Sequence, residues 1–118
     1  MLPEPLLPTD IDGLIEWRDK AYIIIEVKKE GTPLHRGQKL AIERMVRDFQ
    51  RLGKEACAIL VMHNVFDVQK SVFVAEHRVT AVYNGKAWRQ PKTACSAGEF
   101  VRATLDFYER GRNGNHHR

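Results

Sequence analysis

The sequence predicts an α/β fold: a mixed β-sheet flanked by helices, which opens with a β-hairpin and a crossover helix. Three observations lead to this prediction. Two early apolar segments are separated by a short turn, a long amphipathic segment follows them, and the later pair Asn84-Gly85 is a strong hairpin signal. A chain of 118 residues is long enough for one domain. We expect residues 1–110 to form this domain and residues 111–118 to form a flexible polar tail.

The first predicted elements are the two strands of the hairpin. Three prolines within residues 1–9 predict an extended lead-in rather than a helix. Residues 11–17 and 21–28 are predicted strands, joined by a turn at residues 18–20. The second strand is apolar almost to its end, which is typical of a central strand that is covered on both faces.

A helix and a third strand are predicted next. Thr32 is the predicted cap of the helix, Pro33 lies in its first turn, and Gly53 is its predicted end. One apolar stripe recurs along it at helical spacing: Leu34, Ala41, Ile42, Met45, Phe49 and Leu52. Residues 56–62 are a predicted buried strand, which a crossover helix should place parallel to the second strand. Residues 72–75 are either a short strand or an irregular edge.

The last third of the chain predicts a hairpin and a closing helix. Residues 79–83 and 86–90 are predicted strands that flank Asn84-Gly85. The run Ser96-Ala97-Gly98-Glu99 has the spacing of a capping box, which opens a helix. Its predicted apolar residues are Phe100, Val101, Leu105 and Tyr108.

Composition and charge narrow the class of protein. A hydrophobic content of 43% with 29% charged residues is typical of a globular protein rather than a disordered one. No apolar segment is long enough to span a bilayer and no signal peptide opens the chain, so we expect a cytoplasmic protein without a membrane partner. Cys57 and Cys95 lack metal-site spacing, and we expect Cys57 in the core. The net charge of +4 fits a polyanionic partner.

The most informative motif is Glu26-Val27-Lys28, at the end of the second predicted strand. The Glu-x-Lys pattern alone occurs about 0.4 times by chance in a chain of this length. Strand alternation places Glu26 and Lys28 on one face, and the hairpin brings Asp12 beside them. Two adjacent carboxylates need a counter-charge, and Mg²⁺ prefers one or two carboxylates with waters and phosphate oxygens. The residues therefore predict a metal-dependent phosphodiester-cutting centre in which Lys28 holds or helps to deprotonate the attacking water.

These residues resemble the Asp…Glu-x-Lys signature of the PD-(D/E)XK nuclease superfamily. The predicted element order also resembles that fold. Within the superfamily the chain is similar to the small single-domain branch that includes Holliday-junction resolvases and VRR-NUC-type nucleases. The combination of residues 10–13 (Asp-Ile-Asp-Gly), 26–28 (Glu-Val-Lys) and 37–41 (Gly-Gln-Lys-Leu-Ala) resembles small phage-encoded or prophage-encoded nucleases of this group. The resemblance implies a restriction-endonuclease-like core and a nuclease that depends on Mg²⁺ or Mn²⁺. It also implies that Asp12, Glu26 and the backbone carbonyl of Val27 bind metal and that Lys28 is the catalytic lysine.

The sequence departs from the family pattern near its start. Many members carry an acidic residue on a helix before the first strand, whereas only nine residues precede Asp10 here. The outermost metal ligand is therefore Asp10, Gln38 or a group from a second subunit, unless the site works with fewer ligands. Asp12 is favoured over Asp10 as the main aspartate because Gly13 allows substrate or metal to approach closely.

Side chains on the predicted helix extend the site. Gln38 falls on the stripe that faces the sheet, where it either reaches the active site as a catalytic residue or satisfies backbone groups in the first turns. Lys29, His35, Arg36 and Lys39 follow the Glu-x-Lys strand and are predicted to bind the DNA backbone without sequence readout. A second basic set lies on the outer helix face and is interpreted as solvated: Arg44, Arg47, Arg51 and Lys54.

We therefore expect a metal-dependent deoxyribonuclease, and specifically an endonuclease that selects substrates by structure. Cutting both strands of a DNA substrate implies a homodimer, because one such centre cuts one strand. An alternative is a nucleic-acid-binding or assembly protein that keeps the fold without turnover. A third interpretation is a purely structural protein in which Glu26 and Lys28 form a surface ion pair. His63-Asn64 is expected to end a strand rather than to form a His-Asn-His nuclease site.

Overall fold

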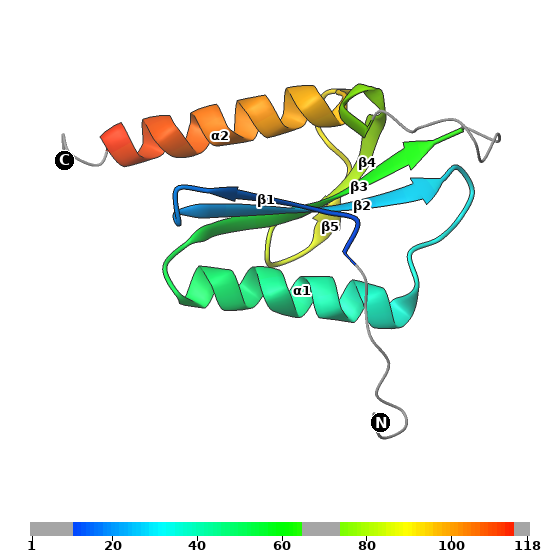
Figure 1. Ribbon diagram of the computed structural model, residues 1–118, viewed down its shortest axis with the longest axis horizontal. Helices are drawn as coiled ribbons and strands as arrows, with labels where there is room; N and C mark the ends of the chain where they lie inside the picture. The colour runs from blue at the N-terminus through cyan, green and yellow to red at the C-terminus, as the bar shows by residue number, and fades with distance from the viewer. Residues whose placement is uncertain (1–10, 65–73, 115–118) are drawn as a thin grey trace, which may run out of the picture.

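The computed structural model describes residues 11–64 and 74–114, which form a five-stranded sheet between two helices (Figure 1). The elements are β1 (Gly13–Trp17), β2 (Ala21–Lys29), α1 (Arg36–Arg51), β3 (Glu55–His63), the 3₁₀ turn η1 (Val74–Glu76), β4 (Arg78–Tyr83), β5 (Trp88–Arg89) and α2 (Ala97–Gly114). The strand order is β1-β2-β3-β4-β5. β2 and β3 are parallel and every other neighbouring pair is antiparallel. This confirms the predicted mixed sheet, the first hairpin and the crossover helix.

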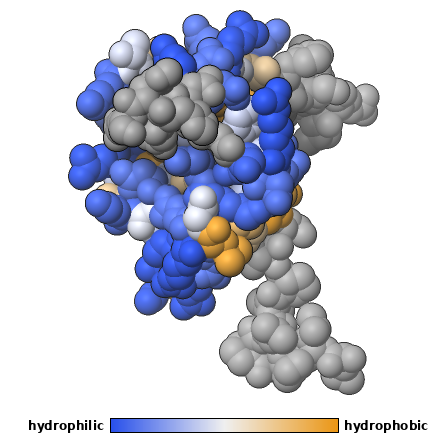
Figure 2. Space-filling model, turned by 90° about the vertical axis from the view of Figure 1, so that its left-hand side faces the viewer, coloured by the Kyte–Doolittle hydropathy of each residue, from blue (hydrophilic) through white to orange (hydrophobic). Residues whose placement is uncertain are grey.

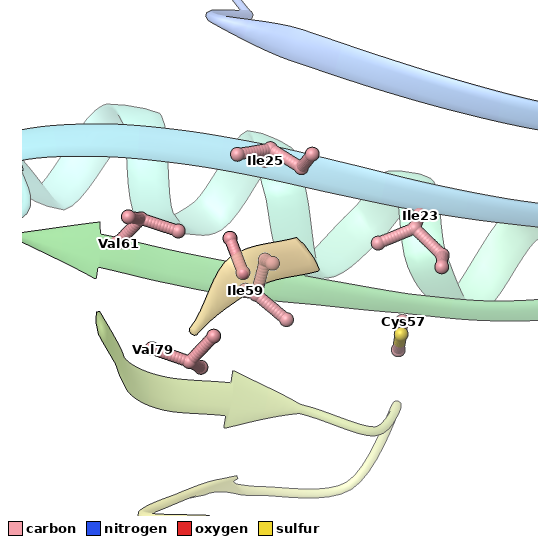
Figure 3. Close-up of a cluster of buried hydrophobic side chains, with 7 residues drawn as sticks. Ile23, Ile25, Cys57, Ile59, Val61 and Val79 are labelled. Carbon is pink, nitrogen blue, oxygen red and sulfur yellow. The ribbon is translucent and has the colours of Figure 1, made fainter. Parts of the chain in front are cut away.

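The core has two layers because β2 and β3 bury side chains on both faces of the sheet. On the α2 side, a cluster from β2, β3 and β4 includes Ile23, Ile59 and Val61 (Figure 3). On the α1 side, Ile24 packs with Ile42 and other residues of the helix stripe. The apolar run of β2 is thus explained by the two helices that cover it. Cys57 lies in the first cluster, as predicted.

The start of α1 differs from the prediction. The helix begins at Arg36, and its cap is His35 rather than Thr32. His35 has extended backbone angles, and its ring Nδ1 accepts a hydrogen bond from the Gly37 N–H at 3.3 Å. Pro33 therefore lies in the loop before the helix instead of in its first turn. The predicted end is confirmed, because Gly53 follows the cap residue with φ +81°.

The apolar stripe of α1 is also corrected at two positions. Leu52 is 72% exposed and does not take part in the core. Val46, which the predicted stripe leaves out, is fully buried against β2 and β3. Leu34 precedes the helix but still packs against this layer.

The second half of the chain follows the predicted hairpin and closing helix. β4 and β5 pair around Asn84-Gly85, and Ser96 and Glu99 exchange the two hydrogen bonds of a capping box. Val74–Glu76 is a 3₁₀ turn rather than a strand, and residues 72 and 73 lie outside the described residues. α2 continues to Gly114, four residues into the segment predicted as a tail.

The surface at the end of the molecule that carries the β1–β2 turn is mostly hydrophilic, with one small hydrophobic area (Figure 2). In the described part of the chain, neither helix has the length and hydropathy needed to cross a bilayer.

Candidate metal and active site

The register of the first hairpin places Asp12 opposite Glu26. Gly13 pairs with Ile25, so the next position along each strand is Asp12 on one side and Glu26 on the other. The Asp12 N–H donates to Glu26 Oε1 at 3.4 Å, and Asp12 Oδ2 accepts from the Val27 N–H at 2.8 Å. Each carboxylate therefore accepts a backbone N–H from the other strand, and the two acids predicted to meet lie side by side just before β1.

The structure gives a different reason for favouring Asp12 as the main aspartate of the site. A Cβ placed on Gly13 would meet the Cβ of Ile25 at 3.4 Å, so this glycine packs against β2 instead of opening the site. Asp12 is instead positioned by its two hydrogen bonds to residues of β2. Asp10 lies outside the described residues.

Gln38 reaches the site from α1. Its Nε2 donates to Glu26 Oε2 at 2.6 Å, so its amide group contacts the carboxylate of Glu26, and its catalytic role stays a prediction. Gln38 is the third residue of the helix, so the N-terminal end of α1 lies next to the carboxylate. The partial positive charge of that helix end favours negative charge nearby.

Glu26 is the one charged side chain that is buried among the described residues, at 1% exposure. Burial and the negative charge of Asp12 raise the pKa of Glu26 to about 7, while the Asp12 N–H and the charge of Lys28 oppose this rise. A carboxyl group with such a pKa changes its protonation near neutral pH. Its charged form gains from any cation that binds beside it.

Lys28 follows Glu26 by two residues on β2 and projects from the same face. Its positive charge favours the ionised form of Glu26. The burial of Glu26 rules out a surface ion pair between these two side chains, so the third interpretation is wrong in that respect.

The donor set of this site fits a small hard cation. Within residues 11–64 and 74–114, no three His, Cys, Asp or Glu side chains are arranged to hold a metal. Asp12 and Glu26 therefore offer two carboxylates, which suits Mg²⁺ because that ion keeps several waters and substrate oxygens as ligands. The Val27 N–H faces Asp12, and the carbonyl of a strand residue points to the same side as its N–H. Val27 can thus add one backbone oxygen.

The predicted DNA-binding residues lie around this end of the sheet. Lys29 is the exposed last residue of β2, and Arg36 and Lys39 are exposed on the first turn of α1, on either side of Gln38. His35 caps α1 through its ring nitrogen, which gives it a structural role. His63 is the last residue of β3, as expected.

β3 and β4 contribute residues to this end of the sheet that the sequence did not predict. Lys28 pairs with Met62, and Met62 pairs with Arg78 at the start of β4. The register shifts between Leu60 and Val61, and no sequence signal marks that irregularity. The sequence therefore did not predict that Lys28, Met62 and Arg78 lie side by side on neighbouring strands.

Comparison with protein-family models, with curated proteins and with solved structures found no match. The resemblance to the PD-(D/E)XK superfamily thus rests on the Asp12, Glu26 and Lys28 motif and on the element order.

Proposed function

We propose that the protein is a nuclease that hydrolyses phosphodiester bonds in DNA with Mg²⁺ or Mn²⁺, and that it acts as an endonuclease. The observation that carries this proposal is the meeting of Asp12, Glu26 and Lys28 at one end of the sheet, with Gln38 bound to Glu26. A buried acid beside a second carboxylate is unfavourable on its own, and a bound cation removes that cost. Restriction-endonuclease-like chemistry depends on a cation bound in this way.

The cation, held by Asp12, Glu26 and the carbonyl of Val27, would supply positive charge at the scissile phosphate and acidify a water. Glu26 must be ionised for this role, and its pKa of about 7 sets the pH at which it becomes so. The amide group of Gln38 holds Oε2 of Glu26 in place by a hydrogen bond. The remaining carboxylate oxygens of Glu26 and Asp12 then keep a fixed orientation toward the cation.

Lys28 is the proposed catalytic lysine. It lies on the face that carries Glu26, from which its ammonium group can orient the attacking water and offset charge that develops on the phosphate. Lys29, Arg36 and Lys39 then hold the flanking DNA backbone as exposed point charges. Cutting of two strands requires a second copy of this centre, and we propose a homodimer for that purpose.

The direct test is cleavage of supercoiled, single-stranded, double-stranded and four-way-junction DNA in the presence of Mg²⁺, Mn²⁺ or EDTA. We expect metal-dependent cleavage of at least one substrate, and at least about a 100-fold loss in Lys28→Gln and Glu26→Gln. Lys86→Gln is the matched control for the lysine, because Lys86 is exposed in the turn between β4 and β5. Binding without cleavage under every condition would favour the alternative, a nucleic-acid-binding or assembly protein.

A further inference from the structure

A pocket opens at the same end of the sheet, one strand away from Lys28. It has a volume of about 250 Å³. Met62 lines this pocket and pairs with Lys28, so the pocket begins about 5 Å across the sheet from the proposed catalytic lysine. A hydrogen bond of 2.7 Å from the Glu30 N–H to the His63 carbonyl oxygen closes the ends of β2 and β3 beside it.

The lining comes from the ends of four segments, β2, β3, η1 and β4. Its residues are Glu30, Met62, His63, Asn64, Glu76, His77, Arg78 and Thr80. A second hollow of about 230 Å³ shares Arg78 and Thr80 and extends toward Gln90 and Pro91.

The chemistry of the pocket suits a planar, hydrogen-bonding group. The rings of His63 and His77 lie 6.1 Å apart, centroid to centroid, with an interplanar angle of 60°, so they present aromatic surface in two orientations. Glu30 and Glu76 can accept hydrogen bonds, and Arg78 can donate them. Aromatic side chains beside hydrogen-bonding groups are the usual means of holding an unstacked nucleobase.

A phosphate group fits less well, because the carboxylates of Glu30 and Glu76 would repel it. The volume of about 250 Å³ is below the range of about 300–1,000 Å³ of most small-molecule pockets, which suits a small planar group.

We propose that this pocket binds one unpaired nucleobase of a DNA strand whose backbone passes Lys28, and that it prefers bases with an exocyclic amino group. This inference rests on the proposed nuclease function and names its substrate class: single-stranded or locally unpaired DNA. The amino preference follows from Glu30 and Glu76, because carboxylates accept hydrogen bonds from groups such as the cytosine amino group. A base inside a duplex must first leave the stack before it can enter.

The test is binding by fluorescence anisotropy in EDTA at pH 8, which separates binding from cleavage. The probes are labelled oligo(dC), oligo(dT) and a base-free deoxyribose-phosphate chain, all of one length, together with a duplex. We expect the wild-type protein to bind oligo(dC) at least about fivefold more tightly than the other three probes. His77→Ala removes an aromatic wall and should bring oligo(dC) down to the affinity of the base-free chain.

Two further variants sharpen the result. Glu76→Gln should reduce the preference for oligo(dC) over oligo(dT) while retaining preference for both over the base-free chain, because it removes an acceptor but not a ring. Lys86→Ala, at the opposite end of β4, should keep the wild-type pattern. Circular dichroism of each variant checks that it is folded.

The two proposals fail in different ways. Equal affinity of the wild-type protein for oligo(dC) and the base-free chain would overturn the pocket assignment, and so would a folded His77→Ala that keeps the full preference. Either result is compatible with metal-dependent cleavage. Base-dependent binding without cleavage under any metal condition would support the pocket and overturn the nuclease proposal.

Discussion

Replacing Glu26 with glutamine separates the stability of the fold from the function of the site. The ordinary pKa of a glutamate is 4.5, and burial together with Asp12 raises that of Glu26 to about 7. Between these values the unfolded chain has released the proton that the folded protein still holds. The free energy of unfolding therefore falls as the pH rises from 4.5 to 7, and it is constant above that range as far as this group is concerned.

The size of this effect follows from the pKa change. At about 1.4 kcal/mol for each tenfold change in proton affinity, the ionised Glu26 costs the folded protein about 3 kcal/mol at pH 8. Glutamine has the same shape and no charge, but it accepts fewer hydrogen bonds, and the N–H of Asp12 and the amide of Gln38 both donate here. Loss of one such bond costs about 1 kcal/mol. Glu26→Gln should therefore stabilise the metal-free protein by about 2 kcal/mol at pH 8.

Thermal and urea unfolding in EDTA at pH 5 and pH 8 measure this difference. We expect Glu26→Gln to melt about 5–10 °C above the wild type at pH 8 and no higher than it at pH 5. Glu55→Gln, at an exposed position that begins β3, is the matched control and should change little. Millimolar Mg²⁺ should raise the melting temperature of the wild type at pH 8 and leave that of Glu26→Gln unchanged. A variant that is less stable than the wild type at both pH values would refute the reasoning.

Three further substitutions test separate contacts, and Gly53→Ala is the control for the first. Gly85→Ala should lower the free energy of unfolding by about 2 kcal/mol or more in urea, because the added Cβ would lie 2.2 Å from the Gln50 Oε1 and φ is +100°. Gly53→Ala, at a position with φ +81° and open space, should lower it by only about 1 kcal/mol. Ser96→Ala removes the acceptor for the Glu99 N–H, and a loss of about 1 kcal/mol is expected in the same urea titration. Gln38→Leu leaves Glu26 Oε2 without its donor, so Mg²⁺ should begin to stabilise this variant only at a higher pH than the wild type, which melting curves across pH 6–9 detect.

The meeting of Asp12 and Glu26 could be predicted because local patterns determine it, whereas for Gln38 the sequence predicted only the face of the helix and left its partner open. Alternation along β2 fixes the face of Glu26, and a short turn fixes the register that brings Asp12 opposite. The helical stripe of α1 then carries Gln38 to the sheet. Each step uses residues that are near one another in the sequence.

Other features depend on competition between residues or on distant pairing. Thr32 and His35 are both able to cap α1, and the chain uses His35, which sequence preferences rank lower. The turn between β1 and β2 lies where it is predicted, at residues 18–20, but its conformation is not predicted, because Arg18 and Asp19 both adopt positive φ without a glycine. Lys54, which lies 35 residues beyond Asp19, binds the carbonyl oxygen of this residue at 2.9 Å.

The pocket beside Lys28 shows why a sequence predicts only some of the residues that meet at a site. Met62 and Arg78 join the row of Lys28 through pairing between three strands, with a register shift inside β3 and β4. Hydrophobic patterning specifies that these strands are buried, but it does not specify which polar residues meet at their ends. Residues such as His63 and His77, which no predicted hairpin or helix connects, come together only when the sheet has formed.

Burial of Glu26 is the strongest physical argument that this end of the sheet has a function. An acid that costs the folded protein stability at neutral pH is poorly explained by packing, because glutamine fills the same space without the charge. The neighbours of Glu26 do not fully offset its charge: Asp12 adds negative charge, Gln38 donates a hydrogen bond without a full positive charge, and Lys28 only partly opposes the rise in the pKa of Glu26. Costs of this kind are typical of sites where a perturbed carboxyl group is needed for binding or catalysis. The arrangement therefore favours a cation-binding role, in which the carboxylate becomes favourable only when its ligand is present.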